Sequence, residues 1–274
     1  MKHMPTSSFK ITSEPNPCFP IHRRIITFVV LLLCLTSSVA AIGDGDFISK
    51  NHSKANEKHW NDVTSPTIGA YPKSKTLAEK AAWDIYKQEQ PSWTFCTINP
   101  SFVQGPSLSV DVGTSLEVDQ KILKTPFVPH VSFGIVDVRD VAEAHIQALR
   151  LPADKVSGKR FILHNETRWM MDMGKILASA VNPKHPHKFI SAPYLVLVFV
   201  SLFDSTVKSI VSSVDKFHEF DNTLSKETLE IKYTDFDTTM KDTAYSLIYH
   251  GLIPKPHDFS YPVENWTPLG SDKN

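Results

Sequence analysis

The pattern that most constrains the fold is an alternation of helix and strand signals between residues 70 and 164. Alanines recur at helical spacing over residues 70–85, and the run "WTFCTINP" (93–100) is β-branched and aromatic, which is typical of a strand. "FGIVDVRDVAEAHIQALR" (133–150) repeats the order strand then helix, and "KRFILH" (159–164) adds another strand. This order predicts an α/β protein with a parallel sheet and helical crossovers.

Local signals predict further details of this region. Pro72 suits the first turn of the first helix, where its missing N–H costs nothing. Residues 135–138 should form a strand, Asp140 should cap the helix that follows, and residues 101–106 should form a tight loop. The inward face of the first helix should carry five aliphatic side chains: Leu77, Ala78, Ala81, Ala82 and Ile85.

From Met170 onward the sequence is mostly helical in pattern. Residues 192–214 place apolar side chains at steps of three and four, and the first half is apolar on all sides, which predicts a helix buried between other elements or lining a pocket. Its uncharged part is too short to cross a bilayer before Asp204. A last helix is expected within residues 235–255, with Asp237 near its cap and Gly251 as its C-terminal stop. These segments predict a smaller, mostly helical lobe.

Charge and cysteine content exclude several classes of function. The 29 basic and 29 acidic residues cancel, so the chain lacks the basic footprint of a nucleic-acid-binding protein. Cys18, Cys34 and Cys96 show neither zinc-site nor disulfide-framework spacing, which favours a reducing, cytoplasmic location. "KHPHK" (184–188) has two histidines but no placed third ligand, so no metal site is predicted and an exposed loop is favoured.

An apolar run near the start of the chain allows three interpretations. After His22, Arg23 and Arg24 no charged residue occurs until Asp44. Residues 22–42 therefore have the layout of a signal sequence, which would imply an ER or secreted protein. Residues 25–42 also approach the length of a membrane anchor, whereas a buried parallel strand has the same apolar character. The three interpretations remain open at this point.

Tyr71 and Lys75 form the pair that points to chemistry. They lie four residues apart and so share one face of the predicted helix, which places an ammonium group near a phenol. A nearby positive charge lowers the pKa of a phenol toward the range useful for proton transfer. Ser37 and Ser38, at the end of the apolar strand, are candidates for holding a carbonyl or hydroxyl oxygen beside this pair.

Four motifs in order make the chain resemble a known family. "TSSVAA", "YPKSKTLAEKAAW", "TINPSFVQGP" and "VDVRDVAEAHIQAL" resemble the extended short-chain dehydrogenase/reductases, in particular the dihydroflavonol reductase-like and cinnamoyl-CoA reductase-like group of the NAD-dependent epimerase/dehydratase family. The resemblance covers about residues 35–255. It implies a Rossmann sheet and hydride exchange between NADP or NAD and a small hydrophobic carbonyl or alcohol substrate.

The resemblance also implies roles for individual residues. Tyr71 would be the proton donor or acceptor, and Lys75 would bond the nicotinamide ribose and support Tyr71. Ser38 would bond the substrate oxygen, with Ser37 the less favoured choice. Pro100 and Val103 match the loop that packs on the nicotinamide, so Tyr71, Lys75, Pro100 and Val103 are the expected cofactor contacts.

The sequence departs from the family at the dinucleotide-binding turn. The nearest approach to G-x-G-x-x-G is Gly43 and Gly45, with Ile48 where the third glycine would be. The alternative function is therefore a truncated, non-catalytic remnant or a membrane-anchored interaction protein.

The resemblance divides the chain into four parts. They are a non-family extension (1–34), the C-terminal part of a dinucleotide-binding domain (35–168), a substrate lobe (169–257) and a tail (258–274).

Overall fold

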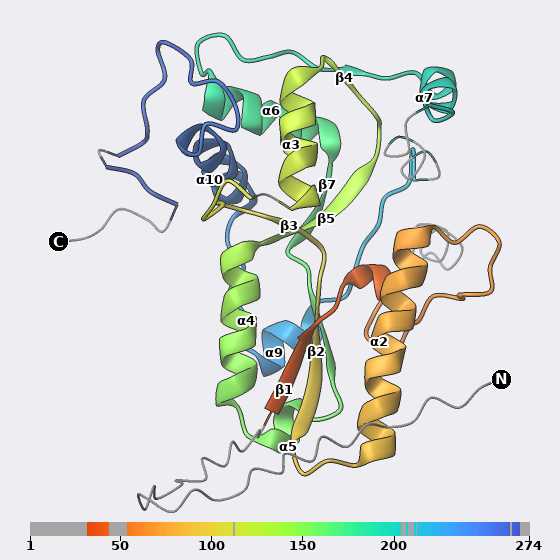
Figure 1. Ribbon diagram of the computed structural model, residues 1–274. Helices are drawn as coiled ribbons and strands as arrows, with labels where there is room; N and C mark the ends of the chain where they lie inside the picture. Colours follow the sequence, from red (N-terminus) through yellow and green to blue (C-terminus); the bar gives the residue numbers. More distant parts are fainter. Residues whose placement is uncertain are drawn as a thin grey trace, which may run out of the picture. The chain divides into compact units, whose positions relative to one another are not determined.

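The fold is known from a computed structural model. It describes residues 32–43, 54–111, 113–203, 207, 211, 213–263 and 265–268. Its central sheet has three parallel strands in the order β1-β2-β6, namely Leu32–Thr36, Thr94–Pro100 and Arg160–Leu163. Helices α2 (Ala70–Glu89) and α4 (Val138–Arg150) flank this sheet (Figure 1). The expected α/β class with parallel strands and helical crossovers is confirmed.

Strand β2 shows why helices cover both faces of the sheet. Alternate side chains of a strand point to opposite faces. Cys96 and Ile98 join an apolar cluster with Ala144 and Ala148 of α4. Phe95 faces the other way and meets Trp83 of α2 edge to face, with ring centroids 4.4 Å apart. Packing of helices on both faces holds the strand ends in fixed positions, where a site can be built.

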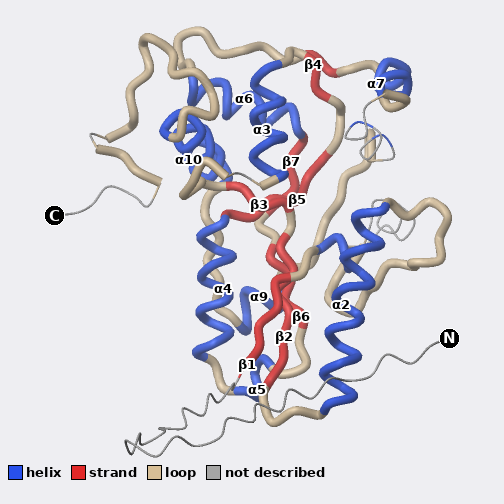
Figure 2. The backbone as a smooth tube through the Cα atoms, in the orientation of Figure 1, coloured by secondary structure: helices blue, strands red, loops and turns tan. Residues whose placement is uncertain are grey.

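A second sheet lies beyond the carboxyl end of the first. It has the order β3-β5-β7, with strands Phe102–Gln104, Ser132–Asp137 and Glu166–Trp169. Strands β3 and β5 are parallel, and β5 and β7 are antiparallel. The expected tight loop at 101–106 is therefore wrong in part, because residues 102–104 bond to β5 as a strand. Figure 2 shows this sheet beside α3, α6 and α10.

Helix α4 begins three residues earlier than the sequence suggested. Asp137 caps α4 by accepting a hydrogen bond from the N–H of Arg139, at 2.8 Å. Val138 begins the helix and does not belong to the strand. Asp140 lies in the first turn, where it accepts two hydrogen bonds from Thr234, from the backbone N–H at 2.9 Å and from the hydroxyl at 2.7 Å. The prediction of Asp140 as the cap is wrong, because that carboxylate anchors a distant loop instead.

From Met170 onward most of the regular elements in the described residues are helices, as expected, but long loops separate them. Met173 and Leu177 of α6 pack against Met240 and Ala244 of α10 in one apolar cluster. Asp235 caps α10, so Asp237 is in the first turn and not at the cap. The remaining elements are α3 (Thr114–Lys124), β4 (Phe127–Val128), α5 (Ala153–Val156), α6 (Met170–Val181), β8 (Ile190–Ser191), α7 (Tyr194–Val200), α9 (Thr223–Thr228) and α10 (Phe236–Tyr249).

Helix α7 contradicts the expectation of a buried helix. Leu197 is 7% exposed, but Leu195 is 80% exposed and Phe199 64%. Phe203, just beyond the helix, is also exposed. The apolar periodicity predicted the helix over residues 194–200, but α7 ends at Val200 and residues 201–203 form a turn. The expected burial is wrong because Leu197 is the one buried side chain of the helix. Residue 210, which belonged to the same expected stripe, is outside the described residues.

Part of the early apolar run forms a strand. Residues Leu32–Thr36 are β1, paired in register with Thr94–Ile98 of β2. Residues 25–31 lie outside the described part of the chain. Within the described ranges, no helix has the length and apolar character that crossing a membrane requires.

Candidate active site

The expected serines lie at the carboxyl end of the central sheet. Beyond β1, the N–H of Ser37 donates to the carbonyl of Ile98 in β2 at 2.7 Å. Ser38 then caps a short 3-10 helix, η1 (Val39–Ala41), and its Oγ accepts a hydrogen bond from the N–H of Ala40 at 3.1 Å. The hydroxyl proton of Ser38 is not used in that bond and can be donated to a ligand. In open α/β sheets, ligands bind outside this edge.

Asn61 and Asn99 hold the serine turn against its neighbours. The Asn61 amide donates to the carbonyl of Ala40 at 2.6 Å and to the hydroxyl of Thr76 in α2 at 3.0 Å. The Asn99 amide, at the end of β2, donates to the carbonyl of Ser38 at 3.2 Å. These bonds tie η1 both to the front of α2 and to the end of β2.

Tyr71 and Lys75 lie together on the first turns of α2. The Lys75 Nζ is 5.7 Å from the centroid of the Tyr71 ring, a cation–π contact. Tyr71 is 59% exposed, so its phenol can be reached from solvent. Pro72 lies in the first turn, as predicted. The helix therefore presents a phenol and an ammonium group at the end that packs beside η1.

Pro100 and Val103 flank the turn from the first sheet to the second. Pro100 is the buried last residue of β2 and is opposite Leu163 of β6. Val103, in β3, is half-buried and packs against the α4 side of the core. Between them lies Ser101, whose buried hydroxyl lacks a hydrogen-bond partner among the described residues. Asn99 joins Ser38 to the strand that ends in Pro100, while Val103 lies in the adjoining sheet.

The inward face of α2 differs from the expectation. Leu77 and Ile85 are 48% and 58% exposed, and Ala78 and Ala81 are also exposed. The buried residues are Thr76, Glu79 and Trp83. The difference arises because the sheet face that packs against α2 is polar and carries Thr97, Asn99 and Arg160. These buried residues require hydrogen-bonding partners, which an apolar stripe cannot provide.

Glu79 is the centre of this polar interior. Arg160 of β6 donates to its Oε1 from Nε at 2.6 Å, and the Asn99 amide donates to its Oε2 at 2.7 Å. Ser37 Oγ, the Trp83 indole N–H and Thr97 Oγ1 donate to the same carboxylate. Glu79 thus links α2 to the serine segment and to both strands beside it.

The ionisation of Glu79 follows from these partners. Burial acts to raise the pKa of the carboxyl, but the Arg160 hydrogen bond and charge, with the Ser37 and Trp83 hydrogen bonds, bring that pKa below its usual value. The carboxylate therefore remains charged in a nearly dry site. Glu79 was not among the predicted site residues. The one feature of the sequence that singles it out is its position one helical turn after Lys75.

Three further predicted features can be placed. Gly43 follows η1, and its N–H donates to the carbonyl of Val39 at 3.2 Å, whereas Gly45 and Ile48 are outside the described residues. Residues 184–188 are exposed. Among the described residues, no group of three or more His, Cys, Asp or Glu side chains is placed to hold a metal ion.

The fold and site together define a class of protein. A parallel sheet flanked by helices, with polar side chains at the carboxyl ends of β1 and β2, is the arrangement of Rossmann-like α/β proteins. No protein-family profile matches the chain.

Comparison with known proteins narrows the class. The chain is 32% identical over 233 residues to a putative uncharacterized oxidoreductase of Schizosaccharomyces pombe, covering 78% of this chain and 62% of that protein. It is 29% identical over 238 residues to the NADPH-dependent methylglyoxal reductase GRE2 of Saccharomyces cerevisiae, covering 80% and 64%. The crystal structure of yeast Gre2 complexed with NADPH superposes with a TM-score of 0.64 at 27% identity, covering 82% of this chain and 66% of that one.

The chain is similar in sequence to proteins named as oxidoreductases and as an NADPH-dependent reductase, and its fold resembles that of yeast Gre2. It spans roughly three-fifths of the length of the curated relatives described above.

Proposed function

We propose that the chain carries the catalytic and substrate-binding part of an NADP- or NAD-dependent reductase that interconverts a carbonyl and an alcohol. The observation that supports this most directly is the grouping of the Tyr71 phenol and the Lys75 ammonium at the end of α2 that is tied through Asn61 to the Ser38 turn. The names of the relatives agree with this chemistry. No observation on the described residues favours a non-catalytic interaction protein.

Each side chain has a distinct role in the proposed reaction. The bound nicotinamide would supply or accept the hydride. In the reductive direction, Tyr71 gives its phenolic proton to the substrate oxygen, and the positive charge of Lys75 stabilises the phenolate that remains. The Ser38 hydroxyl donates a hydrogen bond to the same oxygen and so supports the charge that develops there. In the oxidative direction the same groups act in reverse.

The residues present fit the nicotinamide end of the cofactor. Lys75 would bond the ribose hydroxyls, and Pro100 and Val103 would pack beside the ring, with the unpartnered Ser101 hydroxyl next to them. The sequence has no G-x-G-x-x-G to receive a pyrophosphate at a helix N-terminus. The proposed contacts therefore reach one end of the dinucleotide.

The proposal extends to substrate and location. The mostly helical part from residue 169 to 257 would form the substrate lobe, and its apolar side chains suit a small hydrophobic carbonyl compound. Residues 35–168 would belong to the dinucleotide-binding domain, with residues 1–34 and 258–274 outside both. A cytoplasmic location is proposed because the three cysteines show neither zinc-site nor disulfide-framework spacing.

The proposal is tested by monitoring NADPH oxidation through its absorbance, with methylglyoxal and an aromatic aldehyde as trial substrates. Tyr71→Phe should lower kcat by about 10²-fold or more, because proton donation is lost while the ring remains. Tyr86→Phe is the matched control on the same helix and should keep full activity. Ser38→Ala should lower kcat, and Ser38→Thr should restore part of it. Equal rates for Tyr71→Phe and Tyr86→Phe would contradict the proposal.

A further inference from the structure

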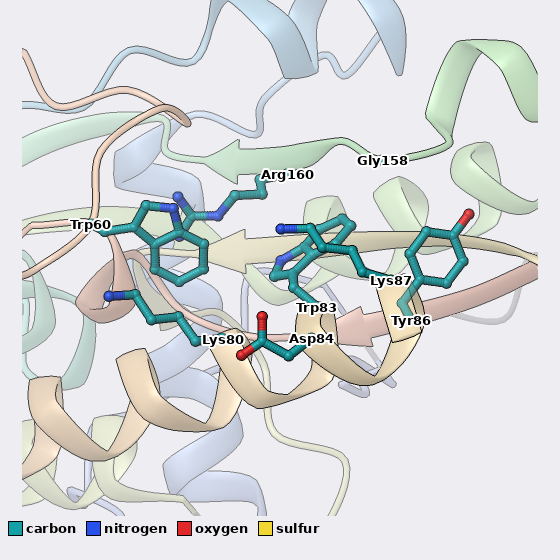
Figure 3. A pocket seen from close by; sticks show the side chains of 8 residues that line it. All are labelled: Trp60, Lys80, Trp83, Asp84, Tyr86, Lys87, Gly158 and Arg160. Atoms are coloured by element: carbon teal, nitrogen blue, oxygen red, sulfur yellow. The ribbon is translucent and has the colours of Figure 1, made fainter. Parts of the chain in front are cut away.

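A pocket separate from the proposed active site lies along the second half of α2. Its volume is about 440 Å³, within the range of sites for small ligands. Tyr86 and Lys87 lie 15 and 16 residues beyond Tyr71, which corresponds to about 22–24 Å along the helix axis. Its lining, shown in Figure 3, is Trp60, Lys80, Trp83, Asp84, Tyr86, Lys87, Gly158 and Arg160.

Aromatic rings form one wall of this pocket. The Arg160 guanidinium carbon lies 3.7 Å from the centroid of the Trp60 ring. Trp83 meets Tyr86 edge to face, with centroids 6.2 Å apart. Planar ligands bind well against such rings because stacking and edge contacts add to apolar burial.

The wall is held in place by hydrogen bonds behind it. The Trp83 indole N–H donates to Glu79 Oε1 at 3.2 Å, which fixes the orientation of that ring. Arg160 donates to the same carboxylate and to the backbone carbonyls of Glu57 and His59, at 2.8 and 2.7 Å. A rigid wall of this kind is preorganised, so a ligand loses little affinity to reordering of the protein.

The charges at the rim favour an anion. Glu79 neutralises Arg160, so the charge available to a ligand comes from Lys80, Asp84 and Lys87. In the described part of the chain Lys80 lies over the Trp60 ring, with its Nζ 5.4 Å from the ring centroid, and its charge also interacts with that of Asp62. Figure 3 shows Lys87 extending from the helix in the direction of Trp60, with Lys80 beside Trp60. Among the lining residues, two ammonium groups and one carboxylate leave a net positive charge beside the aromatic wall, with the Asp62 carboxylate outside the lining.

We propose that this pocket binds a small aromatic anion, with its ring against Trp60 and Trp83 and its carboxylate or other acidic group at Lys80 and Lys87. A neutral aromatic compound would gain the stacking but not the charge interaction. An aliphatic anion would gain the charge interaction but not the stacking. The combination of wall and rim therefore selects molecules that have both features. The site does not depend on the proposed reductase activity.

The test is isothermal titration calorimetry of the full chain with three probes: 2-naphthoate, the neutral 2-naphthalenemethanol and the non-aromatic cyclohexanecarboxylate. Naphthoate should bind about tenfold more tightly than either of the others, the difference expected for one well-placed charge or ring contact. Equal affinity for naphthoate and the alcohol would overturn the proposal.

Variants locate the binding. The double variant Lys80→Gln with Lys87→Gln should weaken naphthoate binding about tenfold without changing the affinity for the alcohol. The matched control, Lys73→Gln with Lys121→Gln, removes the same charge from exposed positions outside the pocket and should bind as wild type. Trp60→Leu should weaken both aromatic probes. Circular dichroism establishes that each variant is folded.

Competition with NADPH separates this site from the proposed cofactor site. An excess of NADPH should leave the naphthoate affinity unchanged, whether or not NADPH itself binds. Displacement of naphthoate by NADPH, or unchanged affinity in the double lysine variant, would overturn the proposal.

Discussion

Helices α2 and α7 differ in what they bury, and neither follows its apolar pattern. In α2 the aliphatic side chains Leu77 and Ile85 are exposed while Glu79 is 1% exposed. In α7 almost the whole apolar surface is exposed, apart from Leu197. The first case has a physical cause in the described structure, because the Glu79 carboxylate satisfies donors from Arg160 and both neighbouring strands. The exposure of α7 has no such cause among the described residues.

The contrast shows that hydrogen-bond demand can decide which face of a helix is buried. A sheet face that carries Thr97, Asn99 and Arg160 cannot be covered by alanine and leucine without leaving polar groups unsatisfied. The acidic residue is therefore turned inward and the aliphatic residues outward. The same carboxylate then fixes Ser37, next to the proposed catalytic serine.

The largest effect is expected from breaking the ion pair beneath α2. Glu79→Gln leaves the Arg160 guanidinium buried without a counter-charge, so the free energy of unfolding should fall by about 3–5 kcal/mol. Glu89→Gln, at the exposed end of the same helix, should change it by less than about 0.5 kcal/mol. Urea denaturation followed by circular dichroism measures both. A loss as small as that of Glu89→Gln would show that the polar interior does not hold α2.

The buried imidazole of His164 should make the free energy of unfolding depend on pH. Burial, with the nearby charges of Lys54 and Lys226, lowers the pKa of His164 from 6.5 to about 4. The unfolded chain therefore binds a proton at higher pH than the folded one. The stability that the folded chain gains from a neutral His164 is complete above pH 6.5 and is lost as the pH falls toward 4. It amounts to about 3 kcal/mol.

Variants isolate the His164 contribution. His164→Gln should flatten the dependence of unfolding free energy on pH between 7 and 4, whereas His187→Gln, in the exposed 184–188 loop, should leave it unchanged. Urea denaturation at several pH values measures the slope. An unaltered slope in His164→Gln would mean that this imidazole is not kept neutral by burial.

The smallest effects concern α7 itself. Leu197→Ala removes the one buried side chain of the helix and should lower the free energy of unfolding by about 2 kcal/mol. Leu195→Ala, two residues away and 80% exposed, should cost less than about 0.5 kcal/mol. Thermal or urea denaturation distinguishes the two. Equal losses would indicate that Leu195 is covered in the folded protein in solution.

The sequence was sufficient for the elements that depend on strong local signals. The strand ending at Pro100, the helix behind Pro72 and the grouping of Tyr71 with Lys75 all follow from periodicity, proline and helical spacing. The cap of α4 was misplaced because Asp137 and Asp140 are both suitable caps, and only the contact with Thr234 distinguishes them. Glu79 could not be found because its partners come from strands 18 to 81 residues away.

We expect the front of α2 and the Ser38 turn to form one site for the nicotinamide end of the cofactor. Titration of the protein with reduced nicotinamide mononucleotide, which lacks the adenosine half, tests this when nicotinamide fluorescence is followed. We predict saturable binding that Lys75→Met weakens about tenfold and Tyr71→Phe weakens less, because the first variant removes the ammonium group that bonds the ribose, whereas the second keeps the ring and loses only the hydroxyl. Absence of saturable binding, or equal binding by Lys75→Met and wild type, would contradict the account.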